Sequence, residues 1–138
     1  MEIKGNIVFP LKVDRSRIHG KGVYSGGSIP AKRKIGSLGG RVISKKEGRI
    51  RARSKRTISL VELWNGKTLD ASVNSNALRY VNHSCKPNTF MRTIGFHVEF
   101  YALTNIAPRE ELTCNYGITH HEGSLKCNCG VEGCLGFL

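Results

Sequence analysis

Long apolar runs are missing from this 138-residue chain, and so are internal repeats, low-complexity tracts and linkers rich in proline or serine. The absence of any eighteen-residue apolar run argues against a membrane-spanning helix. The first residues, Met1–Gly5, lack the apolar stretch of a secretory signal. We therefore expect a single intracellular globular domain with one modest core.

Acidic residues are also scarce, and this shortage is concentrated in one part of the chain. Residues 1–57 hold 16 Lys and Arg against 3 Asp and Glu, whereas residues 58–138 hold 6 against 7. A field of this sign attracts polyanions, and nucleic acid is the natural candidate. A solvated face that keeps the protein soluble explains the same composition, so both interpretations stay open.

Short strands and turns dominate the expected local structure. Ser44 followed three residues later by Glu47 forms a capping box and predicts a short basic helix over Lys45–Arg53. The Asn65-Gly66 pair predicts a hairpin, and the alternation within Phe96–Leu103 predicts a half-buried strand. The remaining expected segments are strands at Asn6–Val13 (with an edge or bulge at Pro10), Val23–Tyr24, Ile35–Ile43, Ile58–Trp64, Thr68–Ala71 and Glu111–Thr113, and one helical turn at Asn76–Tyr80. Since no long helices separate the strands, we expect a mainly β fold and no doubly wound sheet.

Five cysteines in an intracellular chain indicate a metal site or catalysis before disulfides. Three of them, Cys127, Cys129 and Cys134, lie in one glycine-containing loop, and Cys85 is their remote partner. Four thiolates form a closed tetrahedral site of the kind that holds structural zinc. Small buried or redox-active cysteines are the alternative, and Cys114 lies outside the set in either case.

Two other segments say little when taken singly. The Gly20-Lys21-Gly22 segment predicts a turn or a close approach of a ligand, and it lacks the third glycine and the helix of a dinucleotide-binding motif. Glu111–Gly117 reads as a short strand that ends in a tyrosine. No pair of carboxylates suits acid–base catalysis.

In combination, however, the segments Gly20–Val23, Arg79–Asn88 and Glu111–Gly117 and the cysteine cluster resemble, in order and spacing, the SET-domain protein lysine methyltransferases. The resemblance spans about residues 14–138. It implies several small sheets around a C-terminal pseudoknot, with few short helices, in which Glu111–Gly117 lies against Arg79–Cys85. It also implies a SET domain over residues 1–117, with a variable basic insert at 44–67, and a zinc-binding post-SET segment over residues 118–138.

The resemblance implies a role for each matching residue. Three residues are expected to be catalytic: Tyr116, Asn82 and His83. The cofactor S-adenosylmethionine would be held by His19, Gly20, Lys21, Gly22, Arg79, Asn82, His83, Tyr116, Leu125 and Lys126. The channel for the substrate lysine would include Tyr80, Cys114 and Tyr24. One structural zinc ion would be bound by Cys85, Cys127, Cys129 and Cys134, and it would order the tail over the Asn82 loop.

The implied activity is transfer of a methyl group from S-adenosylmethionine to the side chain of a protein lysine, in a histone or another protein. Cys114 stands where the family usually has tyrosine or phenylalanine, which predicts room for di- or trimethylation. Leu38 replaces a frequent tyrosine and Arg41 a frequent glutamate, so a weak enzyme is an alternative. Such a module would dock on nucleic acid or nucleoprotein through basic residues 45–56. We expect a monomer in the nucleus of a eukaryote or the cytoplasm of a bacterium.

Overall fold

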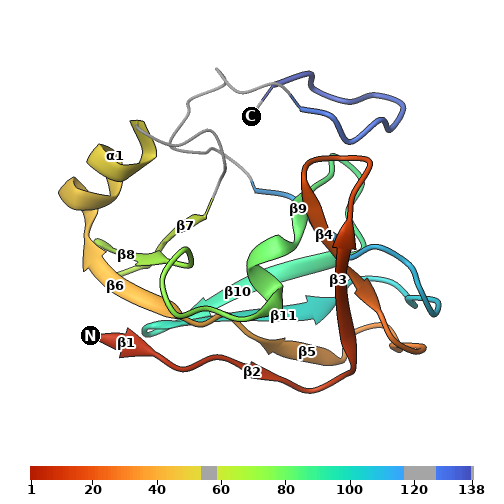
Figure 1. Ribbon diagram of the computed structural model, residues 1–138, viewed down its shortest axis with the longest axis horizontal. Coiled ribbons are helices and arrows are strands. Elements are labelled where there is room, and N and C mark those ends of the chain that lie inside the picture. The colour runs from red at the N-terminus through yellow and green to blue at the C-terminus, as the bar shows by residue number, and fades with distance from the viewer. Residues whose placement is uncertain (54–58, 117–126, 138) are drawn as a thin grey trace.

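The computed structural model describes residues 1–53, 59–116 and 127–137 (Figure 1). Within these ranges the chain forms twelve short strands, one α-helix and one 3-10 turn, so the expected mainly β class is confirmed. The helix, α1 (Lys45–Arg53), has the predicted bounds, and the turn, η1 (Ala77–Tyr80), begins one residue later than predicted. No helix in the described ranges has the length and apolar character needed to cross a membrane.

Two four-stranded antiparallel sheets form the body of the molecule. The first contains, in spatial order, β1 (Glu2–Ile3), β6 (Gly40–Ser44), β8 (Lys67–Asp70) and β7 (Leu60–Glu62). The second contains β10 (Thr89–Ile94), β11 (His97–Ala102), β5 (Lys34–Ser37) and β2 (Asn6–Ile7). Strands β7 and β8 form the predicted hairpin, and Gly66 takes the positive φ of 77° that its turn requires.

Two smaller ladders complete the fold. Strands β3 (Leu11–Arg15) and β4 (Lys21–Ser25) form an antiparallel hairpin. Strands β9 (Asn82–His83) and β12 (Thr113–Cys114) pair in parallel, with Thr113 opposite Asn82 and Cys114 opposite His83. The C-terminal segment therefore lies against the earlier one, as the resemblance implies for the pseudoknot.

Two strands that we expected to be continuous are each divided between sheets. The segment Asn6–Val13 breaks before Pro10, which has no N–H to donate, so β2 and β3 join different ladders. The segment Ile35–Ile43 breaks at Leu38-Gly39, so β5 and β6 also separate. At Gly40 a Cβ atom would lie 2.5 Å from the carbonyl oxygen of Asp70, so this crossing requires glycine.

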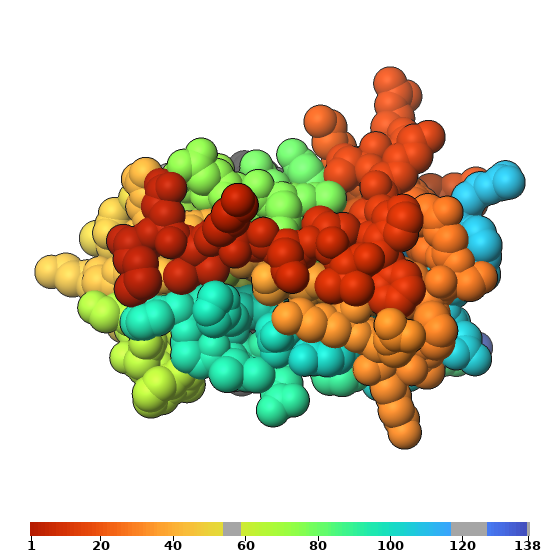
Figure 2. Space-filling model, turned by 90° about the horizontal axis from the view of Figure 1, so that it is seen from below, coloured from red at the N-terminus to blue at the C-terminus, as the bar shows by residue number. Residues whose placement is uncertain are grey.

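One apolar core joins the two large sheets. Its fully buried side chains come from strands and connections in every part of the chain: Val23, Ile35, Leu69, Val98 and Leu112. On β11 the predicted alternation is confirmed, because Val98, Phe100 and Ala102 are buried while His97 is exposed. Figure 2 shows the N-terminal residues as a red band that crosses one face of the molecule, from the neighbourhood of α1 to the β3–β4 side.

Helix α1 covers the first sheet through its small residues. The hydroxyl of Ser44 accepts a hydrogen bond from the backbone N–H of Glu47 at 3.1 Å, as the capping box predicts for its serine. Gly48 and Ala52 are buried against the sheet, and Ala52 forms a small cluster with Ile43 and Leu60. The cationic side chains of the helix therefore lie on its outer side, apart from Arg51, which pairs with the buried Asp70.

Candidate active site

The side-chain amide of Asn82 holds the loop between β3 and β4. Its Nδ2 atom lies 3.2 Å from the carbonyl oxygen of His19 and 3.1 Å from that of Lys21. It also lies 3.1 Å from both Ser16 Oγ and Glu111 Oε2. Asn82 is only 7% exposed, so these bonds are shielded from water. The structure thus brings together the loop and the asparagine that the sequence analysis assigned to the cofactor.

His83 and Tyr116 form the second part of the site. The backbone N–H of Tyr116 donates to Nδ1 of His83 at 3.0 Å, and the two rings lie 5.3 Å apart between centroids. Accepting this bond leaves the Nδ1 atom of His83 without a proton. Burial lowers the pKa of His83 as well, so the imidazole is neutral at physiological pH. Through this contact, β9 fixes the backbone that carries Tyr116.

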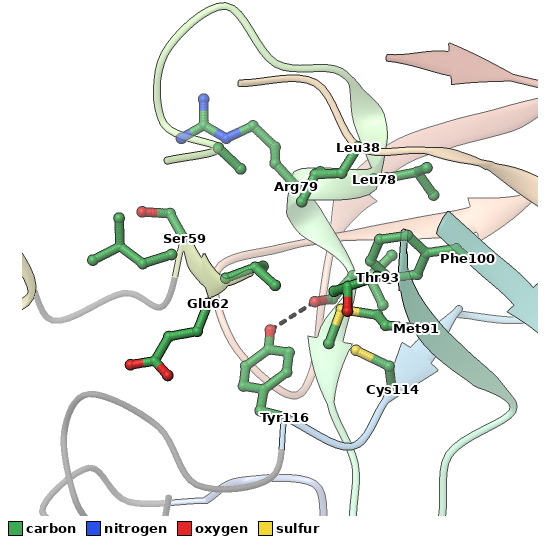
Figure 3. A pocket seen from close by; sticks show the side chains of 14 residues that line it. Leu38, Ser59, Glu62, Leu78, Arg79, Met91, Thr93, Phe100, Cys114 and Tyr116 are labelled. Carbon is green, nitrogen blue, oxygen red and sulfur yellow. Dashed lines mark hydrogen bonds between the residues drawn. The ribbon is translucent and has the colours of Figure 1, made fainter. Parts of the chain in front are cut away.

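A cavity of about 320 Å³ opens beside Tyr116 (Figure 3). Figure 3 shows the Tyr116 ring near Met91 and Cys114, with Leu38 and Arg79 on the opposite side. The Tyr116 hydroxyl donates to the carbonyl oxygen of Val81 at 2.6 Å. The remaining lining is mostly apolar and comes from β7, η1, β10, β11 and the residues next to β7 and β8: Ser59, Leu60, Val61, Glu62, Ala71, Leu78, Thr93 and Phe100.

The Cys114 thiol and the Tyr116 hydroxyl stay neutral at physiological pH. Burial raises the pKa of the Cys114 thiol to about 12. Burial likewise raises the pKa of the Tyr116 hydroxyl above its ordinary value, and Cys114 and Glu111 add to the shift. The cavity therefore presents a phenol and a thiol, and neither carries charge.

The other two tyrosines expected in the channel lie outside this cavity lining. Two cations approach the ring of Tyr80: Arg79 Cζ lies 5.0 Å and Lys21 Nζ 5.8 Å from the ring centroid. Tyr24 donates from its hydroxyl to the carbonyl oxygen of Arg15 at 2.6 Å. Arg79 both lines the cavity and contacts Tyr80, and Lys21 of the β3–β4 hairpin contacts the same ring.

Four cysteines meet at a second centre, next to the first. The sulfur atoms of Cys85, Cys127, Cys129 and Cys134 all lie within 4.8 Å of one another. Two of the separations are 3.7 Å (Cys85 to Cys134) and 3.4 Å (Cys129 to Cys134). A tetrahedral zinc ion with bonds of about 2.3 Å separates its sulfur ligands by about 3.8 Å, so the cage already has the right size. The cage could hold zinc. Because Cys85 follows His83 by two residues, the cage lies directly next to the site that contains His83.

Glycines allow the tail to wrap around this cage. Gly130 and Gly133 have φ values of 72° and 79°, in the left-handed region that favours glycine. The backbone N–H of Cys127 donates to the carbonyl oxygen of Gly136 at 2.8 Å and closes the loop. The expected adenine contacts, Leu125 and Lys126, lie outside the described residues.

Sequence reasoning missed Glu111 and Asn88. The carboxylate of Glu111 accepts from Ser16 Oγ at 2.7 Å, next to its contact with Asn82. The side chain of Asn88 bonds to the backbone N–H of Thr113 and to the carbonyl oxygen of Glu111, each at 2.8 Å, and so fixes the start of β12. The only signal in the sequence was their position at the ends of the two key segments, Arg79–Asn88 and Glu111–Gly117.

With the geometry established, comparison with known proteins identifies the family. The SET domain family model matches residues 20–117. This match covers well over half of the chain, and the chain belongs to the SET domain family. The resemblance noted from the motifs is thereby confirmed.

The relatives and structures that this chain is similar to carry the same domain within longer chains. Histone-lysine N-methyltransferase 2B of Homo sapiens is 34% identical over 145 residues, which cover 91% of this chain and 5% of that protein. Histone-lysine N-methyltransferase set-2 of Caenorhabditis elegans is 32% identical over 137 residues, covering 93% of this chain and 9% of that protein. The crystal structure of Arabidopsis thaliana SUVH6 in complex with SAM superposes with a TM-score of 0.82 at 27% identity, covering 96% of this chain and 33% of that one. The chain thus spans a small part of the length of these curated relatives.

Proposed function

We propose that this chain is a protein-lysine N-methyltransferase that uses S-adenosylmethionine. One observation carries the proposal: the Tyr116 hydroxyl and the Cys114 thiol lie on one cavity wall, directly beside the strand that carries Asn82 and His83. The similarity to histone-lysine methyltransferases and to a SET structure solved with its cofactor supports the same conclusion.

The residues around the β3–β4 loop fit a cofactor of this kind. S-adenosylmethionine supplies an electrophilic methyl group when it is bound. The amide of Asn82 orients the carbonyl groups of His19 and Lys21, and Tyr80 offers an aromatic face beside them. Lys21 and Arg79 supply positive charge that suits the cofactor's carboxylate. We assign this region, together with Gly20, Gly22 and His83, to cofactor binding, and Leu125 and Lys126 remain predictions.

The cavity suits a neutral substrate amine. A free lysine has a pKa of about 10.4 and is protonated at physiological pH, so it must lose a proton before it can accept a methyl group. Apolar walls lower the pKa of an amine that enters them. Tyr116 and Cys114 stay uncharged there, so neither of them stabilises the ammonium form as an anion would. In this proposal Tyr116 aligns the amine, because alignment supplies much of the rate in an in-line displacement.

Zinc has a structural role in this proposal. Four thiolates leave no open position on the metal, so the ion would join the tail to the segment after β9 and perform no chemistry. We propose the same division as before, with a SET domain over 1–117, a basic insert at 44–67 and a post-SET segment over 118–138. The family match ends at residue 117, which supports this boundary.

The substrate is proposed to be a protein lysine, in a histone or a similar protein, because the named relatives are histone-lysine methyltransferases. A nuclear location follows if the source is a eukaryote, and a cytoplasmic one if it is a bacterium. The rival proposal is a weakly catalytic module that docks on nucleic acid. The exposed cations of α1, namely Lys45, Lys46, Arg49 and Arg53, favour it.

Labelled-cofactor transfer tests the proposal. Wild type and Tyr116→Phe are incubated with methyl-labelled S-adenosylmethionine and with histones, a peptide array or cell extract. Removing one preorganised donor from an active site lowers kcat by about 100-fold or more, and we expect a loss of that size. Tyr101→Phe is the matched control, because its hydroxyl contacts Glu99 at 3.0 Å on β11 and does not line the cavity. Equal transfer by wild type and Tyr116→Phe would refute the proposal, and background labelling in both would favour the binding module.

A further inference from the structure

The carboxylate of Glu111 is the meeting point of three segments that lie far apart in the sequence. Its Oε2 atom accepts from Ser16 Oγ at 2.7 Å and lies 3.1 Å from Asn82 Nδ2. Its Oε1 atom lies 3.5 Å from the hydroxyl of Tyr24 on β4. The partners are 95, 29 and 87 residues away along the chain. A single side chain thus connects the β3–β4 hairpin, β9 and the residue that leads into β12.

Gly22 gives this carboxylate the space that it occupies. A Cβ atom at position 22 would lie 2.4 Å from Glu111 Oε2 and 3.0 Å from Glu111 Cδ, which is a clash. Gly22 lies within strand β4 and does not have a positive φ, whereas Gly20 has a φ of 45°. The turn therefore depends on Gly20, whereas glycine at position 22 leaves the Glu111 carboxylate in place, because a larger residue there would displace it.

The hydrogen bonds pass from Glu111 into the backbone of the loop. Ser16 Oγ, which donates to Glu111, also accepts from the backbone N–H of Ile18 at 3.0 Å. The backbone N–H of Ser16 donates to the carbonyl oxygen of Gly20 at 2.8 Å. An asparagine amide has only two protons for four neighbouring acceptors, so the bonds made by Ser16 and Glu111 decide where the amide of Asn82 can point.

The backbone around Glu111 adds to this connection. The Glu111 position bridges to Tyr24, and the next residue, Leu112, donates its N–H to the carbonyl oxygen of Val23 at 2.8 Å. Five residues after Glu111 the same segment carries Tyr116. The short stretch from Glu111 to Tyr116 therefore both holds the loop assigned to the cofactor and carries the tyrosine assigned to the substrate.

We propose that Glu111 is a positioning residue, whose carboxylate, acting through Ser16 and Asn82, holds the loop at His19–Lys21 in the shape that binds the cofactor. This inference rests on the proposed function for its link to the cofactor. It predicts that removal of the carboxylate weakens cofactor binding while the methyl-transfer step, which depends on Tyr116, is retained at saturating cofactor.

The test compares Glu111→Ala with Glu110→Ala. Glu110 is the matched control, since its carboxylate contacts Asn88 Nδ2 at 2.8 Å and has no described contact with the hairpin. Loss of a hydrogen bond to a charged group corresponds to about a tenfold change in affinity or more, so we expect Kd and KM for S-adenosylmethionine to rise at least tenfold in Glu111→Ala. We expect kcat to stay within about threefold of wild type. Glu111→Gln keeps a side-chain oxygen for Ser16 and Asn82 and should restore most of the affinity.

A double mutant sharpens the test. Gly22→Ala alone displaces the carboxylate and should weaken binding as Glu111→Ala does. In the Glu111→Ala background the clash with the carboxylate is gone and only the Cβ atom of Ser16, at 3.0 Å, stays close, so the same substitution should weaken binding less than it does in wild type. Additive losses in Kd would overturn the proposal, and so would wild-type Kd and KM in Glu111→Ala.

Hydrogen exchange separates this proposal from the proposed function. In the absence of cofactor, amides of residues 16–22 should exchange at least tenfold faster in Glu111→Ala than in wild type or Glu110→Ala, because Ile18 and Ser16 lose their fixed acceptors. If wild type fails to bind S-adenosylmethionine while this difference is present, the proposed function fails and the role of Glu111 in holding the loop stands. Unchanged exchange at residues 16–22 would refute that role whatever the cofactor does.

Discussion

Replacement of Cys85 by serine tests the join between the tail and the rest of the chain. Cys85 is the ligand that lies apart in sequence, since the other three sulfurs come from residues 127–134. Cys85 and Cys134 are 49 residues apart along the chain, yet their sulfurs lie 3.7 Å from one another. A metal bridge between them therefore closes a long loop.

The size of the effect follows from the entropy of this loop. A cross-link that closes a loop of about 49 residues removes roughly 4 kcal/mol of chain entropy from the unfolded state. A 138-residue domain has a melting entropy of about 0.29 kcal/mol/K, so the loss corresponds to a fall in Tm of about 14 °C. Cys85→Ser should show a fall of this order, and the bound zinc should drop from one ion per chain to well below one.

Metal analysis and calorimetry on the same samples provide the assay. Cys114→Ala is the control, because Cys114 is buried in the cavity wall and is not part of the cage. This control should keep one zinc ion per chain even though the lost sulfur lowers its stability. The reasoning would be refuted if Cys85→Ser kept its zinc, or if wild type purified under reducing conditions carried none.

Two further outcomes concern Cys114. If the proposed function holds, mass spectrometry should find di- or trimethylated product from wild type, and Cys114→Tyr should shift the product toward one methyl group. This expectation would be contradicted if the wild-type product stops at one methyl group and Cys114→Phe leaves it unchanged. Burial raises the pKa of the Cys114 thiol from about 9 in the unfolded chain to about 12. The contribution of this thiol to the free energy of unfolding is therefore fully present below pH 9 and is lost as the pH rises toward 12. Urea unfolding at pH 8, 9 and 10 should therefore show a decline of up to about 1.4 kcal/mol per pH unit from this group, and Cys114→Ala should give a flatter curve.

The elements that sequence predicted correctly are those whose cause is local. Helix α1 begins at the serine cap that defines it, and the β7–β8 hairpin turns at Asn65-Gly66. Strand β11 follows the alternation of its own side chains. In each case the signal and the structure lie within about ten residues of one another, so no tertiary contact was needed to find them.

The errors arose where a distant segment decides the outcome. The break between β5 and β6 depends on the approach of Asp70 to Gly40, which no neighbouring residue announces. Strand β10 had no prediction, because four of its six residues are exposed and it depends on its pairing with β11. Glu111 was overlooked for the same reason, since its nearest side-chain partner is 29 residues away. The motif residues themselves were found because the family pattern carries this long-range information.

The position of the basic helix bears on which substrates the site can accept. Its residues Lys45, Lys46 and Arg49 are exposed, and no residue of α1 lines the cavity next to Tyr116. The helix instead packs its small residues on the first sheet, which turns its cations toward solvent. Exposed charges are also weakened by physiological salt, which screens them over about 8 Å. Two charged side chains line the described cavity wall, Glu62 and Arg79. Glu62 is opposite in sign to a basic peptide, and the positive charge of Arg79 lies over the ring of Tyr80. The charge of residues 45–53 therefore gives no reason to exclude basic, histone-like peptides from the site.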